Sequence, residues 1–187
     1  MQKTISFIPV DYERDLELIY KWMHEPHVIP YWQLNMPFSK FEVHLKRALD
    51  DQHQTLYLGY MDGVPMSYWE AYWVNGDVVE KCYEPEMKDQ GIHLLIGEAD
   101  FLGKGYSQQV LEAMVEFQFR ESETQKVIAE PDIRNDKMIH VFEKCGFKAI
   151  KPIKLPDKTG LLMFCDRERF GRMRKNDRTK SRTGSHL

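Results

Sequence analysis

The sequence is poor in cysteine and has no long apolar segment, and both absences narrow the possible functions. Its three cysteines, Cys82, Cys145 and Cys165, are far apart and include no CxxC pair. Neither a disulfide framework nor a zinc site is therefore predicted. No apolar run is long enough for a transmembrane helix, and the first residues do not have the pattern of a signal peptide. We expect a cytoplasmic protein without a resident metal ion.

The chain also lacks a strong net charge of either sign. Its formal net charge is −3, with 26 Lys and Arg against 29 Asp and Glu, which argues against binding to nucleic acid or to a membrane surface. Charge is nevertheless uneven, because residues 171–187 carry six Lys or Arg and one Asp. That stretch has no apolar periodicity. We therefore expect one domain at 1–170, followed by a basic, disordered tail at 171–187.

Apolar periodicity predicts a mixed α/β domain with the element order β-α-α-β-β-β-α-β-α-β-β. Asp62-Gly63, between two apolar runs, is typical of a two-residue hairpin turn. Ser39-Lys-Phe-Glu42 fits a capping box at the start of a helix that ends near Asp50. The predicted sheet is antiparallel in its first part and parallel around a central helix, with further helices flanking it.

The stretch 91–119 contains the sequence pattern that is most informative about function. It runs from an apolar strand at 92–96, interrupted only by His93, through a glycine-containing turn into an amphipathic helix. A helix N-terminus has unpaired N–H groups and partial positive charge, and glycines let the backbone approach an anion. This pattern predicts that Gly103-Lys104-Gly105-Tyr106-Ser107 binds phosphate. A turn whose glycines serve only packing is the plainer alternative.

Two motifs in this order resemble the GCN5-related N-acetyltransferase (GNAT) superfamily. Leu102-Gly103-Lys104-Gly105-Tyr106-Ser107 is similar to the pyrophosphate loop Arg/Gln-x-x-Gly-x-Gly/Ala, and Asn135 with Phe142-Glu-Lys-Cys-Gly-Phe147 is similar to a later motif. The resemblance implies a GNAT fold and an acyl-CoA co-substrate whose pyrophosphate is held by the loop. It also implies that Leu95 and Asn135 bind the cofactor, Asn135 beside the pantetheine arm. Asn135 could equally serve as the N-cap of the next helix.

A narrower resemblance covers nearly the whole chain up to Phe170. Segments 65–73, 91–98 and 129–132 are similar to siderophore-biosynthesis acyltransferases, namely aerobactin-type hydroxylysine acetyltransferases and mycobactin-type lysine acyltransferases. Aminoglycoside 6′-N-acetyltransferases are similar too, but usually carry Asp where this chain has His93. The chain departs from the superfamily at Phe142, where a tyrosine often protonates the leaving thiolate. Two alternatives therefore remain: another group protonates the thiolate, or the chain is a CoA-binding module without catalysis.

The resemblance implies that His93 is the catalytic base. An amine with a pKa of about 10 is protonated at neutral pH and cannot attack, whereas a base with a pKa of about 6.5 can take its proton. Asp132 lies just past the next strand and would orient His93 or bind the amine. An aspartate that caps the turn before Asn135 is an equally good explanation. Glu130 is the second candidate, because its spacing from His93 is similar to that of the second acid in the aminoglycoside enzymes.

Aromatic residues and carboxylates suggest where the acceptor binds. Trp32, Trp69, Glu70, Trp73 and Glu130 are the candidates, because aromatic walls with a carboxylate suit a lysine-like cation with an aliphatic stem. At least one of the two strand tryptophans is more simply explained as sheet core. The sequence thus predicts an acyl-CoA-dependent acyltransferase, a monomer or weak dimer, that acts on a small amine or hydroxylamine. Aminoglycoside acetylation is the alternative.

Overall fold

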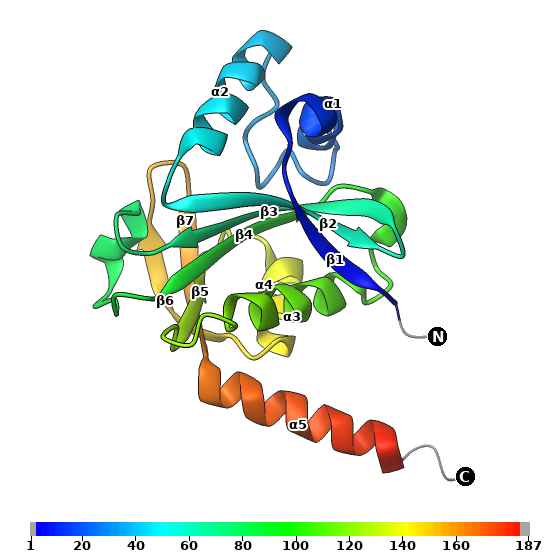
Figure 1. The fold of residues 1–187 in the computed structure, drawn as a ribbon. Helices are drawn as coiled ribbons and strands as arrows, with labels where there is room; N and C mark the ends of the chain where they lie inside the picture. Colours follow the sequence, from blue (N-terminus) through cyan, green and yellow to red (C-terminus); the bar gives the residue numbers. More distant parts are fainter. Residues whose placement is uncertain (1–2, 184–187) are drawn as a thin grey trace.

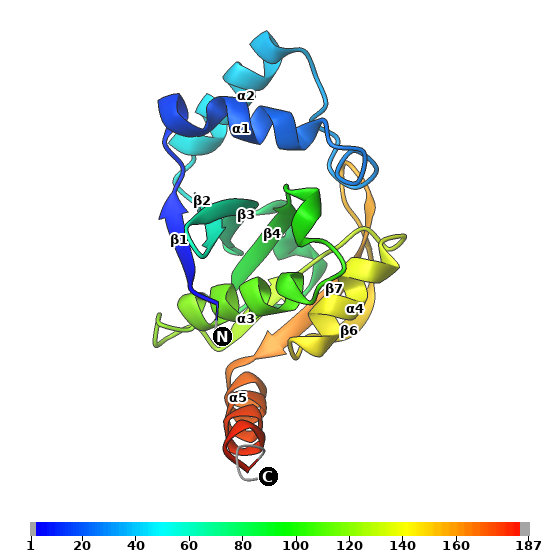
Figure 2. The same cartoon turned by 90° about the vertical axis from the view of Figure 1, so that its right-hand side faces the viewer.

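The computed structural model describes residues 3–183 and shows one seven-stranded sheet with helices on both faces (Figures 1 and 2). Helices α1 (Tyr12–Met23) and α2 (Phe38–Asp50) lie on one face, and α3 (Tyr106–Gln118) and α4 (Asp136–Lys144) lie on the other. The strands, in sheet order, are β1 (Ile5–Pro9), β2 (Gln54–Met61), β3 (Val64–Trp73), β4 (Gln90–Ile96), β5 (Lys126–Ala129), β7 (Thr159–Asp166) and β6 (Lys148–Lys154). Two short 3-10 helices complete the order, η1 (Val78–Cys82) and η2 (Ala99–Phe101).

The pairing of β4 determines where the sheet opens. On one side β3 runs antiparallel to β4 along the whole strand, as far as the pair Ser67 and Ile96. On the other side β5 runs parallel to β4 but pairs with it only at Gln90 and Gly91. Beyond Gly91 the backbone polar groups of β4 have no β5 partner. The expected mixed sheet, antiparallel first and with a parallel central pair, is confirmed.

Each face of the sheet buries its own apolar cluster. Leu111 and Met114 of α3 pack with Trp69 and Ile92 on one face, and α1 and α2 pack with Tyr68 and other residues on the opposite face. The amphipathic helices predicted from the sequence therefore cover the sheet as their apolar stripes require. None of the helices in the described part of the chain is long and apolar enough to cross a membrane.

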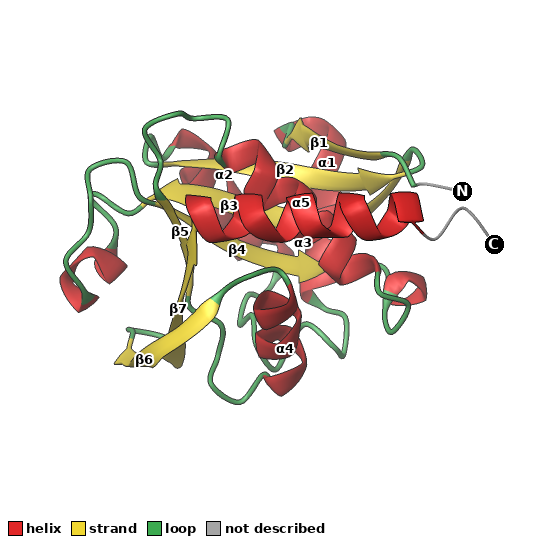
Figure 3. Ribbon diagram, turned by 90° about the horizontal axis from the view of Figure 1, so that it is seen from below, coloured by secondary structure: helices red, strands yellow, loops and turns green. Residues whose placement is uncertain are grey.

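The expectation of a disordered tail is wrong for residues 171–183. Helix α5 (Arg167–Thr183) follows β7 directly, crosses the predicted boundary at residue 170, and lies beside α3 (Figure 3). Phe170 is buried against Phe119, with 5.6 Å between ring centroids, and Arg174 reaches Glu112 and Glu116 of α3 at 3.1 Å each. Because only a few residues of α5 contact the domain, the helix has no apolar periodicity that the sequence analysis could detect. Residues 184–187 lie outside the described range.

Candidate active site

A cavity of about 1160 Å³ is lined by both faces of β4. His93 and Leu95 belong to the face covered by α1 and α2, whereas Ile92 and Leu94 belong to the face covered by α3 and α4. The loop between α1 and α2 forms a roof through residues 27–34. The cavity is therefore continuous across the opening between β4 and β5, and it can bring ligands on the two faces together.

One end of the cavity is the N-terminus of α3. Gly103 and Gly105 have φ of 69° and 77°, a conformation that glycine adopts at little cost. Gly105 is the N-cap and no side chain caps the helix, so the first-turn N–H groups remain available to an anion. Ser107 lines the cavity here, whereas the predicted contacts Lys104 and Tyr106 do not line it with their side chains. Any contribution from those two would come through backbone N–H groups.

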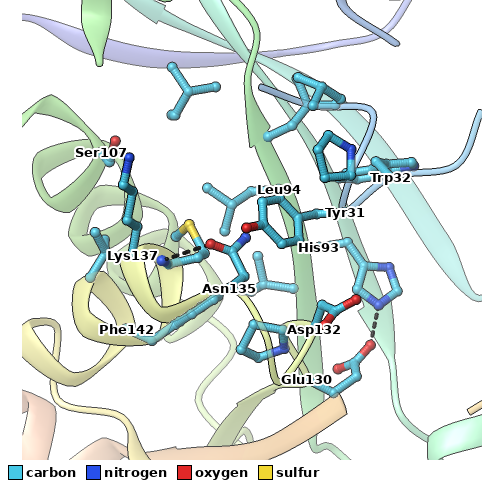
Figure 4. A pocket seen from close by; sticks show the side chains of 18 of the residues that line it. Tyr31, Trp32, His93, Leu94, Ser107, Glu130, Asp132, Asn135, Lys137 and Phe142 are labelled. Atoms are coloured by element: carbon cyan, nitrogen blue, oxygen red, sulfur yellow. Dashed lines mark hydrogen bonds and ion pairs between the residues drawn. The ribbon is translucent and has the colours of Figure 1, made fainter. Parts of the chain in front are cut away.

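Lys137 of α4 adds a cation at this end that the sequence did not single out. Figure 4 shows its side chain pointing toward Ser107, and both residues line the cavity. An ammonium beside a helix N-terminus favours a phosphate group. Lys137 could not be identified from sequence because α3 and α4 meet only in the fold. Its position two residues after Asn135 was the sole signal.

Asn135 and Leu95, which the sequence predicts to bind the cofactor, both line the cavity. Asn135 is also the N-cap of α4, because its Oδ1 accepts a hydrogen bond from the Met138 N–H at 3.2 Å. The capping bond uses one lone pair of the side-chain carbonyl and leaves its NH₂ group free to donate. Capping and contact with a pantetheine arm are therefore compatible.

His93 lies between two carboxylates. Glu70, directly opposite on β3, accepts a hydrogen bond from Nδ1 at 2.9 Å, and Glu130, just after β5, accepts one from Nε2 (Figure 4). The hydroxyls of Tyr68 and Tyr72 donate to the second oxygens of Glu70 and Glu130 at 3.0 and 2.7 Å. A ring whose two nitrogens both donate to carboxylates is an imidazolium. We call Glu70, His93 and Glu130 the acid–histidine cluster.

The two glutamates shift the titration of His93. Burial alone would lower its pKa, but the charges and hydrogen bonds of Glu130 and Glu70 outweigh burial and raise the pKa to about 10. His93 in turn holds the pKa of both carboxyl groups below the usual range, against the effect of their own burial. In the unliganded protein His93 is therefore charged at neutral pH. The expected free base with a pKa of about 6.5 is not what the resting site contains.

All three members of the cluster line the cavity, and His93 is the most exposed of them. Its side chain is 31% exposed, against 3% for Glu130. The ring lies over Tyr72, with 4.8 Å between centroids, and faces the edge of Trp32 at 6.3 Å. The two predicted candidates Trp32 and Glu70 therefore do reach the site, and Glu130 holds His93 rather than serving only as an acceptor contact.

Asp132, predicted to orient His93, has a different partner. Its carboxylate accepts hydrogen bonds from the backbone N–H, Nε and Nη2 of Arg134 at 2.9, 2.9 and 2.7 Å. These bonds, above all those from the side chain, hold its pKa low despite partial desolvation. Within residues 3–183, Asp132 makes no hydrogen bond to His93. It lines the cavity, but Glu130 takes the place beside the histidine.

The two strand tryptophans do not form the acceptor pocket. Trp69 is fully buried on the opposite face of the sheet, donates to the Ser67 hydroxyl at 2.8 Å, and packs edge-on against Phe7. Trp73 lies beneath the Lys88 ammonium, 5.2 Å from its ring centroid, and is not part of the cavity wall. Both belong to the framework, because alternation along β3 turns them away from Glu70.

Comparison with known proteins finds related sequences over most of the chain. The model of the acetyltransferase (GNAT) domain family matches residues 11–155. N-hydroxyputrescine acetyltransferase from Acinetobacter baumannii is 38% identical over 173 residues, covering 90% of this chain and 81% of that protein. N(6)-hydroxylysine O-acetyltransferase from Escherichia coli is 29% identical, covering 91% of this chain, which spans only 54% of that protein.

Solved structures have the same fold. An uncharacterised protein from Bacillus halodurans is 50% identical, with a TM-score of 0.89 over 91% of this chain and 88% of that one. The aminoglycoside acetyltransferase AAC(6')-Ib, solved in complex with coenzyme A, is 26% identical, with a TM-score of 0.83 over 91% of this chain and 99% of that one. The chain belongs to the GNAT acetyltransferase family and is an acyl-CoA-dependent acyltransferase.

Proposed function

We propose that this protein transfers an acyl group from acyl-CoA to the nitrogen of an N-hydroxylated diamine or a lysine-like amine, a step in building a siderophore. The acid–histidine cluster on the cavity wall carries the proposal. The similarity to the Acinetobacter N-hydroxyputrescine acetyltransferase supports this acceptor class. A hydroxylamine is a weaker base than an alkylamine, so its nitrogen lone pair is available at neutral pH.

The charge of the cluster suits a cationic or proton-donating acceptor. One imidazolium and two carboxylates sum to a single negative charge, which attracts a positively charged acceptor. A cation bound beside His93 disfavours the imidazolium and lowers its pKa, since like charges repel. Acceptor binding thus prepares His93 to take the proton that the attacking nitrogen must lose.

The shape of the cavity supports direct attack of one substrate on the other. In this proposal acyl-CoA lies with its pyrophosphate at the α3 N-terminus and its pantetheine between Asn135 and β4. The thioester then reaches the opening of the sheet next to His93. The acceptor enters from the face of α1 and α2, below Trp32, and its nitrogen attacks the thioester carbon. Holding both reactants in one cavity makes the step effectively intramolecular.

Acetylation of an aminoglycoside is the second candidate function. Its support is the overall similarity to the AAC(6')-Ib structure and the acidic cavity wall. Besides the acid–histidine cluster, that wall includes Asp77, Asp132 and Asp157. Amino sugars carry several ammonium groups, which such a wall would attract.

Thiol release from acetyl-CoA with a panel of acceptors separates the two functions. We expect kcat/KM for N-hydroxyputrescine or N6-hydroxylysine to exceed that for kanamycin by roughly tenfold or more. The His93→Gln variant, at equal folded concentration, should lose on the order of 100-fold or more in kcat. Preference for kanamycin would favour antibiotic modification instead, and full activity of the variant would contradict the role of His93.

We also propose a cytoplasmic location and a monomeric or weakly dimeric state. The three cysteines Cys82, Cys145 and Cys165 are all free. Unpaired thiols suit a reducing compartment, where acyl-CoA is also available.

A further inference from the structure

Acyl transfer expels a thiolate from CoA, and that thiolate must receive a proton. Position 142, where the superfamily often has a tyrosine, is occupied by Phe142. Its ring is 3% exposed, reaches the cavity wall, and packs edge-on against Phe147 with 4.9 Å between centroids. A phenyl ring has no proton to give, so the proton must come from elsewhere.

The tyrosine and histidine side chains nearest the acid–histidine cluster are already engaged in hydrogen bonds. The hydroxyls of Tyr68 and Tyr72 donate to Glu70 and Glu130, and both nitrogens of His93 are bonded to the same two glutamates. The Nε2 of His27 is bonded to the Ile96 carbonyl at 2.7 Å. None of these groups has a proton free for a thiolate.

Tyr31, from the roof, differs from these groups. It lines the cavity and is 41% exposed, and among the described residues its hydroxyl has no hydrogen-bond partner. Figure 4 shows its ring entering the cavity hydroxyl first, between Ser107 at the pyrophosphate end and His93 at the acceptor end. In the binding mode proposed above, the thioester lies between those two ends, where the phenol points.

The roof is attached to the wall that would hold the pantetheine. Arg134 donates from Nη2 to the Pro30 carbonyl at 3.3 Å while its other bonds fix Asp132. This bond joins the residue before Tyr31 to the residue before Asn135. The pKa of Arg134 is raised, first by Asp132 and to a smaller extent by Tyr31. A guanidinium in this position also stabilises a phenolate formed nearby.

We infer that Tyr31 is the catalytic acid that protonates the CoA sulfur. The inference rests on the acyl transfer proposed above. The acceptor nitrogen bonds to the thioester carbon and loses a proton to the acid–histidine cluster. The C–S bond then breaks with its electron pair on sulfur, the Tyr31 O–H proton moves to that sulfur, and the phenolate is reprotonated from solvent. The phenol thus enters from the roof instead of from α4.

Removing the single hydroxyl tests this role. Tyr31→Phe should lower kcat on the order of 100-fold while the KM for acetyl-CoA changes by less than about threefold, because the interaction acts at the leaving group rather than in binding. Tyr60→Phe is the matched control on β2, outside the cavity wall, and should retain wild-type kcat. Retention of kcat within about threefold by Tyr31→Phe would overturn the inference.

The pH profile separates an acid from a structural role. Replacing Tyr31 with a fluorinated, more acidic tyrosine should move the high-pH fall of kcat to lower pH, and Tyr31→Phe should lack that fall. If the fluorinated variant loses kcat at the same high pH as the wild type, the inference is contradicted. The charged and titratable groups that line the cavity around this point come from the roof, β3, β4, the segment after β5, α4 and the turn between β6 and β7; they are His27, Glu70, His93, Glu130, Asp132, Arg134, Asp136, Lys137, His140, Lys144, Asp157 and Lys158.

The experiments distinguish an error in the proposed function from an error in the role of Tyr31. Wild-type turnover with the acceptor panel tests that function, whereas the ratio of variant to wild type tests Tyr31 alone. The ratio can be measured with whichever acceptor is active, including kanamycin. It can also be measured from the slow hydrolysis of acetyl-CoA by water, which expels the same thiolate.

Discussion

His93 receives its two partners from strands that are distant in the sequence. Glu70 faces it across the β3–β4 pair, and Glu130 follows β5. The sequence pointed to all three residues but placed Asp132, not Glu130, beside the histidine. It could not weigh the competing local bond, because Asp132 is bound by Arg134 two residues later. Nor could it show that two carboxylates would keep His93 charged.

The raised pKa of His93 predicts a particular pH dependence. If the free protein must lose the imidazolium proton before reaction, kcat/KM should rise with pH up to about 10. Glu130→Gln removes one negative charge, so the pKa of His93 falls. The rise of kcat/KM with pH should therefore occur at lower pH in this variant. Asp132→Asn is the control and should not change the pH at which kcat/KM rises, since Asp132 pairs with Arg134. Equal shifts in both variants would refute the assignment of Glu130.

Elements with a strong local signal were predictable. The strand, turn and helix at 92–118 appear as expected, because alternation, glycine and amphipathic spacing are all local. The capping box at Ser39 was wrong: α2 begins at Phe38 with Pro37 as its N-cap, and no side chain caps it. A proline at this position has its φ already fixed and starts the helix without a side-chain bond.

The turn before α3 supports a prediction with a close internal control. Gly105→Ala must place a side chain at φ 77°, which costs about 1 kcal/mol of folding stability. Gly63, in the hairpin turn, has φ 80°, and, as at Gly105, no atom lies within 4 Å of an added Cβ. Both alanine variants should lose similar stability in urea unfolding. Only Gly105→Ala should weaken CoA binding in calorimetry, by roughly tenfold, because of the two turns only the one before α3 lines the cavity and is proposed to hold the phosphate.

Unchanged, wild-type CoA affinity in both glycine variants would contradict the placement of the pyrophosphate at α3. A loss of affinity in both would show that general destabilisation, and not the turn, is responsible. The comparison is informative because Gly63 lies between β2 and β3, outside the cavity wall.

At the scale of the whole molecule, the opening between β4 and β5 is the feature on which the proposed mechanism depends. It exists because β5 pairs with β4 at only two positions, and it joins the α3–α4 face to the α1–α2 face. The sequence predicted the mixed sheet but not where pairing ends, since strand length does not reveal register. The positions of the roof at 27–34 and of helix α5 likewise depend on tertiary contacts, such as Arg134 to Pro30 and Arg174 to Glu112, which the sequence does not reveal.

The most direct test of the account identifies the product. Acylation of an N-hydroxydiamine nitrogen gives a hydroxamate, which binds ferric iron as a coloured complex, whereas acylation of an ordinary amine gives none. With acetyl-CoA and N-hydroxyputrescine, we expect one hydroxamate for each CoA thiol released, and on the order of 100-fold less product from His93→Gln at equal folded concentration. Thiol release without hydroxamate, or equal product from the two proteins, would contradict the account.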